Sequence, residues 1–135
     1  MDLFVFSTVS GKGQEQLKES LKTFFPKRKV KICQTFEKLS QRLKLPAELG
    51  SIVVLAPGSR EDLLRILSKR DLLRGLRTVV IAPDHEVETT GIAYQLRPRY
   101  LTYLNGNFGD LAAVLHKMVA GHPSDEALSW SHSDG

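Results

Sequence analysis

Residues 52–57 read Ile-Val-Val-Leu-Ala-Pro, and residues 79–83 read Val-Val-Ile-Ala-Pro. Each stretch is a continuous apolar run that ends in the same Ala-Pro pair and is followed by a helix-like segment. Continuous apolar runs are typical of strands that are buried on both faces, and a helix after each strand predicts a parallel sheet. The two stretches therefore indicate an α/β domain with this sheet at its centre.

Strands and helices alternate on either side of these two runs. Strands are predicted at 3–7, 30–34, 52–55, 78–82 and 100–104, and 30–34 alternates as a half-solvated edge strand would. Apolar residues recur at helical spacing before Pro26, over 36–45, after Ser59, over 87–96 and from 111 to 118. Ser59, together with Asp62, resembles a capping box at the start of its helix. Because parallel neighbours need helical crossovers, we expect a doubly wound five-stranded parallel sheet in the order 2-1-3-4-5, with helices on both faces.

Length and composition are those of one globular domain. The chain has 135 residues, of which 41% are hydrophobic and 25% are charged, and these fractions are ordinary for a soluble protein. We expect the domain to cover residues 1–121, followed by a polar, flexible tail over 122–135 that exposes Trp130. Since no apolar run could span a bilayer and no basic leader precedes the first strand, we expect a cytoplasmic protein without a membrane partner.

Charge and cysteine content narrow the possible partners. The net charge is +4, and its dense basic cluster at 27–31 (Lys-Arg-Lys-Val-Lys) is interpreted as protection of the edge strand. We do not expect nucleic-acid binding, because no Arg/Gly/aromatic pattern accompanies the cluster. The single Cys33 has no metal-ligand spacing to another Cys or His, so we predict a packed thiol and neither metal nor cofactor.

The order and spacing of the elements, from residue 3 to the last helix, resemble a response-regulator receiver domain of the flavodoxin-like type. Residues 51–58 (Ser-Ile-Val-Val-Leu-Ala-Pro-Gly) look like the third strand of that family. Residues 99–104 (Arg-Tyr-Leu-Thr-Tyr-Leu), followed by Phe-Gly-Asp-Leu at 108–111, look like its closing strand and loop. The likeness is architectural.

The resemblance also shows which chemistry is missing. Receivers hold Mg²⁺ with an acidic pair after the first strand and accept a phosphoryl group on an aspartate that ends the third strand. Here Ser7 and Thr8 stand in place of the acidic pair, and Ala56 stands in place of the acceptor. Ala82 replaces the hydroxyl residue that ends the fourth strand, and Tyr103 or Leu104 replaces the lysine that ends the fifth. The resemblance therefore implies a pseudo-receiver that is not an enzyme and works by binding other proteins.

Receivers often present an output surface built from the fourth helix, the fifth strand and the fifth helix. Tyr94, Arg97, Arg99 and Tyr103 fall on these elements, and Tyr100 is expected close to the same surface. Tyrosine and arginine are enriched at interfaces, so these residues form a candidate interface for a protein partner or a second copy of the chain. The alternative is a solvated basic loop.

Two other hypotheses remain. A small molecule or nucleotide could bind the free backbone amides of the helix starts near Ser10, Gly11 and Ser59, although the spacing lacks a phosphate-loop motif. An enzyme could use Asp84 or His85, but the consecutive residues Asp-His-Glu at 84–86 would not point at one centre.

Overall fold

A computed structural model of the chain describes residues 3–24, 32–45, 51–104, 111, 113–115 and 117–118, with the side chains of residues 23 and 24 excepted. The basic cluster at 27–31, the loop at 108–110 and the predicted tail with Trp130 lie outside the described residues, so the expectations for them stay predictions.

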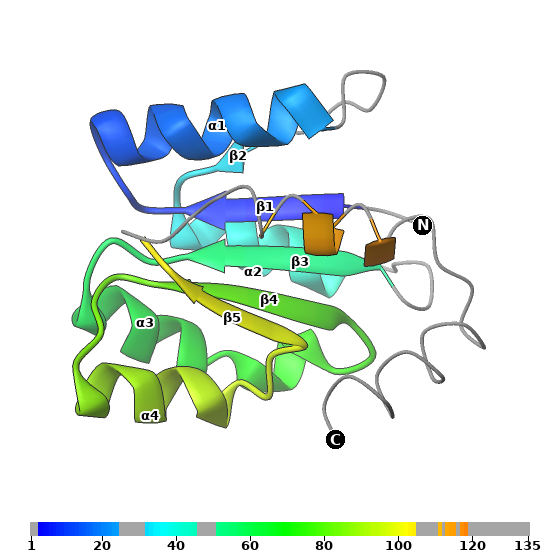
Figure 1. The fold of residues 1–135 in the computed structure, drawn as a ribbon. Helices are drawn as coiled ribbons and strands as arrows, with labels where there is room; N and C mark the ends of the chain where they lie inside the picture. The colour runs from blue at the N-terminus through cyan, green and yellow to red at the C-terminus, as the bar shows by residue number, and fades with distance from the viewer. Residues whose placement is uncertain are drawn as a thin grey trace.

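Five strands form one parallel sheet (Figure 1). Its order is β2-β1-β3-β4-β5, and every neighbouring pair is parallel. This confirms the predicted order and the flavodoxin-like α/β fold. The strands are β1 (Leu3–Ser7), β2 (Ile32–Cys33), β3 (Ile52–Ala56), β4 (Arg77–Ala82) and β5 (Tyr100–Tyr103).

The connecting segments fold as helices that begin and end near the predicted positions. They are α1 (Lys12–Phe24), α2 (Phe36–Lys44), α3 (Arg60–Leu67), the 3-10 helix η1 (Arg70–Leu73) and α4 (Val87–Gln95). The predicted cap of α3 is confirmed, since the Ser59 side chain accepts a hydrogen bond from the Asp62 amide at 3.2 Å. Gly75, with φ of +80°, then turns the chain from η1 towards β4.

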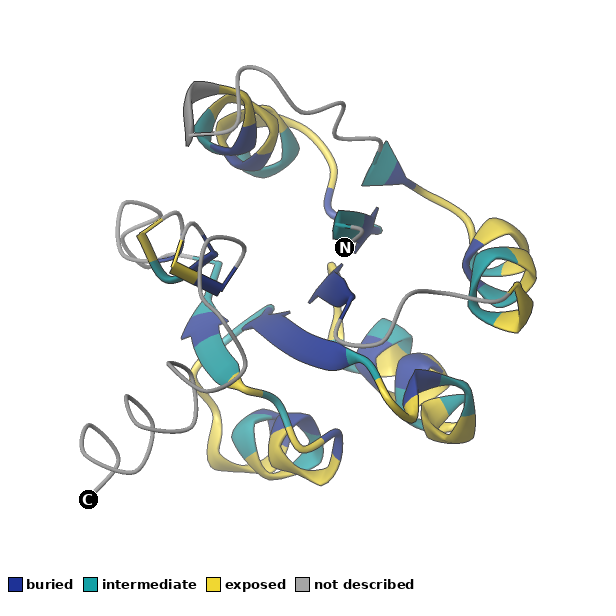
Figure 2. Cartoon of the chain, turned by 90° about the vertical axis from the view of Figure 1, so that its right-hand side faces the viewer, coloured by how far each residue is buried: buried dark blue, intermediate teal, exposed yellow. Residues whose placement is uncertain are grey.

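Alternate residues of the strands pack into two separate clusters, because successive side chains point to opposite faces of a sheet. One cluster joins Val54 and Val79 to Leu17 of α1 and to Leu111. The other joins Leu55 and Val80 to buried residues of α2, α3 and α4. Figures 1 and 2 show α1 on one side of the sheet and α2, α3 and α4 on the other. Every residue of β3 and β4 is buried, as the continuous apolar runs predicted, and the Cys33 thiol is buried as expected.

Arg77 is the one charged residue in these central strands. Only 7% of it is exposed, and its guanidinium donates a hydrogen bond to the Met118 carbonyl at 3.0 Å. Burial, and after it the positive charge of Arg99, lowers the pKa of Arg77. A buried arginine therefore links the amino-terminal end of β4 to the residues that follow β5.

Leu55 and Val80 test the central packing, because both side chains are fully buried in neighbouring strands. Leu55→Ala should lower the free energy of unfolding by about 2 to 5 kcal/mol, and Val80→Ala by somewhat less. The control is Leu64→Ala, since Leu64 is 46% exposed. Urea melts in which both core variants match this control would refute the packing described.

Candidate functional site

The carboxyl end of β1 is tied to the loop after β3 by the side chain of Thr8. Ser7 and Ala56 are register partners at the ends of the two strands. One residue later, the Thr8 hydroxyl accepts a hydrogen bond from the Gly58 amide at 2.7 Å and donates one to Asp62 Oδ2 at 2.8 Å. This hydroxyl therefore joins the carboxyl end of β1 to the loop after β3 and to the first turn of α3.

Local sequence explains how Asp62 reaches Thr8. The Ser59 cap starts α3 directly after the β3 loop and places Asp62 in its first turn, where a carboxylate is favoured by the helix dipole. Gly58 is needed because a Cβ there would lie 2.9 Å from the Thr8 carbonyl oxygen. The Ser7 hydroxyl, fully buried, accepts a hydrogen bond from the Val9 amide at 3.1 Å.

A second link joins the starts of α3 and α4. Arg60 Nε donates to Thr89 Oγ1 at 3.0 Å, and its Nη1 donates to Glu88 Oε2 at 2.7 Å. Its Nη2 forms an ion pair with Glu86. A single guanidinium thus contacts three residues at the start of α4, in the forked geometry that suits carboxylates.

A third link joins the loop after β4 and the helix α4 to the end of β5. The rings of His85 and Tyr103 are stacked with centroids 3.9 Å apart, and the Tyr103 hydroxyl lies 3.1 Å from Thr90 Oγ1. Asp84 accepts a hydrogen bond from the Glu86 amide at 2.9 Å. The three residues 84–86 therefore have three different sets of partners and do not share a centre, as the sequence suggested.

These links lie at the carboxyl ends of the strands, where the resemblance to receivers predicts the metal-binding and phosphate-accepting positions. The hydroxyls of Ser7 and Thr8 form hydrogen bonds within the chain, and the methyl side chains of Ala56 and Ala82 are buried. The Asp62 carboxylate accepts a hydrogen bond from the Thr8 hydroxyl, and the Asp84 carboxylate accepts one from the Glu86 amide. Within the described ranges, no group of three or more His, Cys, Asp or Glu side chains could hold a metal ion.

The predicted anion site at the helix starts falls on residues with different environments. Ser59 uses its hydroxyl to cap α3. Ser10 and Gly11 are exposed, and Gly11 has a φ of +68°, which suits a glycine in a tight turn before α1.

The predicted interface residues lie at two ends of β5. Tyr94 is 62% exposed on α4, and Arg97 and Arg99 are exposed just before β5. Tyr103 lies at the other end of the strand, half-buried against α4. Tyr100 packs against the cluster that contains Leu17, on the opposite face of β5 from Tyr103, because residues three apart in a strand point to opposite faces. Its place at the candidate interface stays a prediction.

The exposed face of α4 has an unusual composition that sequence reasoning missed. Val87 is 87% exposed and Tyr94 is 62% exposed, and nothing lies within 4 Å of a Cβ placed at Gly91 between them. Thr89, in contrast, is fully buried. The helix therefore directs a polar residue inward and an apolar stripe at i, i+4 and i+7 outward, and that spacing was the available signal.

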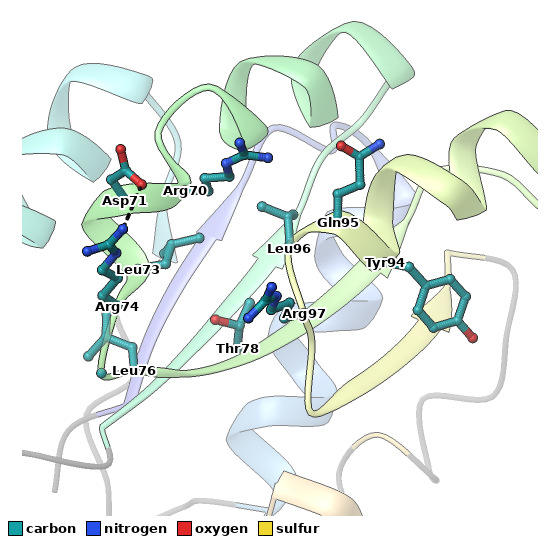
Figure 3. Close-up of a pocket in the computed structure, with 11 residues that line it drawn as sticks. Arg70, Asp71, Leu73, Arg74, Leu76, Thr78, Tyr94, Gln95, Leu96 and Arg97 are labelled. Carbon is teal, nitrogen blue, oxygen red and sulfur yellow. Dashed lines mark ion pairs between the residues drawn. The ribbon is translucent and has the colours of Figure 1, made fainter.

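A cleft of about 650 Å³ lies at the opposite edge of the sheet from these three links, between η1 and the end of α4 (Figure 3). No local motif marks this cleft, because its residues come together only through the topology. The residues that line it are Arg70, Asp71, Leu73, Arg74, Gly75, Leu76, Thr78, Tyr94, Gln95, Leu96 and Arg97.

No family model matches the chain, and neither the curated proteins nor the solved structures contain a significant match. Across the described ranges, no helix has both the length and the apolar character that a membrane crossing requires.

Replacing Thr8 by valine tests the link between β1 and β3. Thr8→Val keeps the shape but leaves the Gly58 amide and the Asp62 carboxylate without this partner, so the free energy of unfolding should fall by roughly 1 to 3 kcal/mol. Thr8→Ser retains the hydroxyl and should lose less than half as much in urea melts. Equal losses for the two variants would show that the hydroxyl is not what stabilises this edge.

Proposed function

We propose that this chain is a non-phosphorylatable, receiver-like signalling module of the cytoplasm that binds a protein partner or a second copy of itself. The binding surface is the outer face of α4, defined by Val87, Gly91 and Tyr94, together with Arg99 next to β5. The observation that carries the proposal is the exposure of Val87 and Tyr94, 87% and 62%, on a helix that buries Thr89.

The chemistry of this face suits protein recognition. A helix that meets only water normally directs polar side chains outward, whereas interfaces combine apolar and aromatic residues with arginine. Gly91 leaves room for a partner's side chain between the two larger residues. Arg99 is exposed at the start of β5, where its guanidinium can pair with a carboxylate across an interface.

The residues at the carboxyl edge support a binding role over phosphoryl transfer. Accepting a phosphoryl group needs a carboxylate nucleophile, and the position equivalent to it carries the buried methyl group of Ala56. Ser7 and Thr8 use their hydroxyls in hydrogen bonds that hold the fold together. The buried Cys33 thiol, which is not part of a disulfide, is compatible with a reducing compartment.

The double variant Val87→Ser, Tyr94→Ser tests the α4 face. Removing both apolar anchors should weaken self-association or partner binding at least about tenfold, because exposed apolar and aromatic residues at the centre of an interface contribute most of its affinity. Sedimentation velocity reports self-association, and quantitative pull-down reports partner binding. Arg99→Glu should weaken the same interaction by turning attraction into repulsion.

Leu64→Ser is the matched control, because Leu64 is an exposed apolar residue on α3 with 46% of its surface accessible. It should leave association unchanged, and circular dichroism should be the same for all variants. If wild type and the double variant associate equally in both assays, the α4 face is not the functional surface.

A further inference from the structure

The cleft between η1 and the end of α4 carries an excess of positive charge. Arg70, Arg74 and Arg97 line it, and Asp71 is the one acidic residue among its lining residues. The carboxyl end of α4 adds roughly half a negative charge, which is smaller than the excess. The cleft is therefore a positively charged concavity (Figure 3).

These charges are not neutralised by neighbouring side chains. Arg74 and Asp71 form an ion pair of 3.7 Å between side chains that are 85% and 83% exposed, and such pairs are weak in water. Within the part of the chain that the structure describes, Arg70 and Arg97 make no ion pair and no side-chain hydrogen bond. Two guanidiniums are thus available to a ligand.

Thr78 supplies an independent sign of a missing partner. It is only 3% exposed, and its side chain lines the cleft. Its carbonyl accepts a hydrogen bond from the Arg99 amide at 2.6 Å, but its hydroxyl has no partner among the described residues. Buried polar groups are normally hydrogen-bonded, so an unbonded hydroxyl in a cleft is a position that a water, a ligand atom or an ion can fill.

The backbone of Arg97 points to the same conclusion. Its φ is +53°, the only positive value at a non-glycine residue of the described chain. The position follows the end of α4, where glycine is usual, and it precedes Pro98, which disfavours this conformation further. Strain of this kind is commonly stored at functional sites. An arginine is therefore kept where glycine would be more stable, and its side chain lines the cleft.

We propose that this cleft binds a small molecule that carries a phosphate monoester. Arg97 donates to the phosphate oxygens in the forked geometry that guanidinium and phosphate share, and the Thr78 hydroxyl donates a further hydrogen bond. Arg70, which Leu96 separates from them in Figure 3, adds positive charge elsewhere along the cleft. Leu73, Leu76 and Leu96 contact the organic part of the ligand. The volume lies within the usual range for small-molecule sites.

A phosphate dianion matches the charge of this cleft better than a monoanion does. Three guanidiniums and one carboxylate leave about two positive charges before the dipole of α4 is considered, and a monocarboxylate would match only part of them. A nucleic-acid strand would need a basic stripe along the surface, not a concavity. The proposal goes beyond partner binding through α4 and does not rest on it.

Titration of the ¹⁵N-labelled protein with glycerol 3-phosphate tests the site. At pH 7.5, saturable amide shifts should appear at Leu76, Thr78 and Arg97, and sodium chloride at matched ionic strength should not reproduce them. Binding should weaken below about pH 6, because the second pKa of a phosphate monoester is about 6 and the ligand becomes a monoanion.

Variants identify the groups that bind. Arg70→Gln, Arg97→Gln should weaken binding at least about tenfold. Lys18→Gln, Lys22→Gln removes the same charge from exposed positions of α1 and should change the affinity less than about twofold. Thr78→Val should also weaken binding, since it removes the hydroxyl without changing the shape.

Arg97→Gly separates ligand binding from stability. It relieves the positive φ, so it should raise the melting temperature while it weakens phosphate binding. The proposal is overturned if chloride produces the same shifts, or if the arginine and lysine double variants lose affinity equally. Val87→Ser alone reads association separately, because Val87 does not line the cleft, whereas Tyr94 does.

Discussion

The hydroxyl of Thr8 is the group on which the carboxyl edge of this sheet depends. It accepts from the Gly58 amide and donates to Asp62, so one side chain joins the loops after β1 and β3 to the first turn of α3. Arg60, two residues before Asp62, extends the connection to the start of α4. Polar contacts within the chain thus occupy the edge at which α/β sheets of this type usually bind ligands.

The same contacts determine how α4 is oriented. Arg60 Nε satisfies the hydroxyl of Thr89, which lets a polar residue be fully buried at the start of this helix. With Thr89 inward, the helical period places Val87, Gly91 and Tyr94 outward. The contact between Arg60 and Thr89 therefore fills part of the carboxyl edge of the sheet. It also turns outward the apolar face of α4, to which we assign partner binding. The cleft lies beyond the other end of α4, next to Arg97.

Much of the fold was predictable from the sequence because its signals are local. The two apolar runs, the Ser59 cap and the polar edge strand depend on neighbouring residues, and they gave the order 2-1-3-4-5. The link through Thr8 joins residues 50 and 54 positions apart, which no local pattern encodes. Arg70, Thr78 and Arg97 likewise line one cleft only because the topology places η1, β4 and the end of α4 side by side. The likeness to receivers stays a prediction, since it rests on architecture alone.

Amide NMR of the wild-type protein with Mg²⁺ and beryllofluoride, a mimic of an aspartyl phosphate, tests the central claim most directly. If hydrogen-bonded side chains and buried methyl groups occupy the carboxyl edge, the amides of Val9, Gly58 and Leu104 should not move beyond the changes caused by Mg²⁺ and fluoride alone. Shifts at these three amides that require Mg²⁺ and beryllofluoride together would contradict the account, because they would show an open acceptor site at the strand ends.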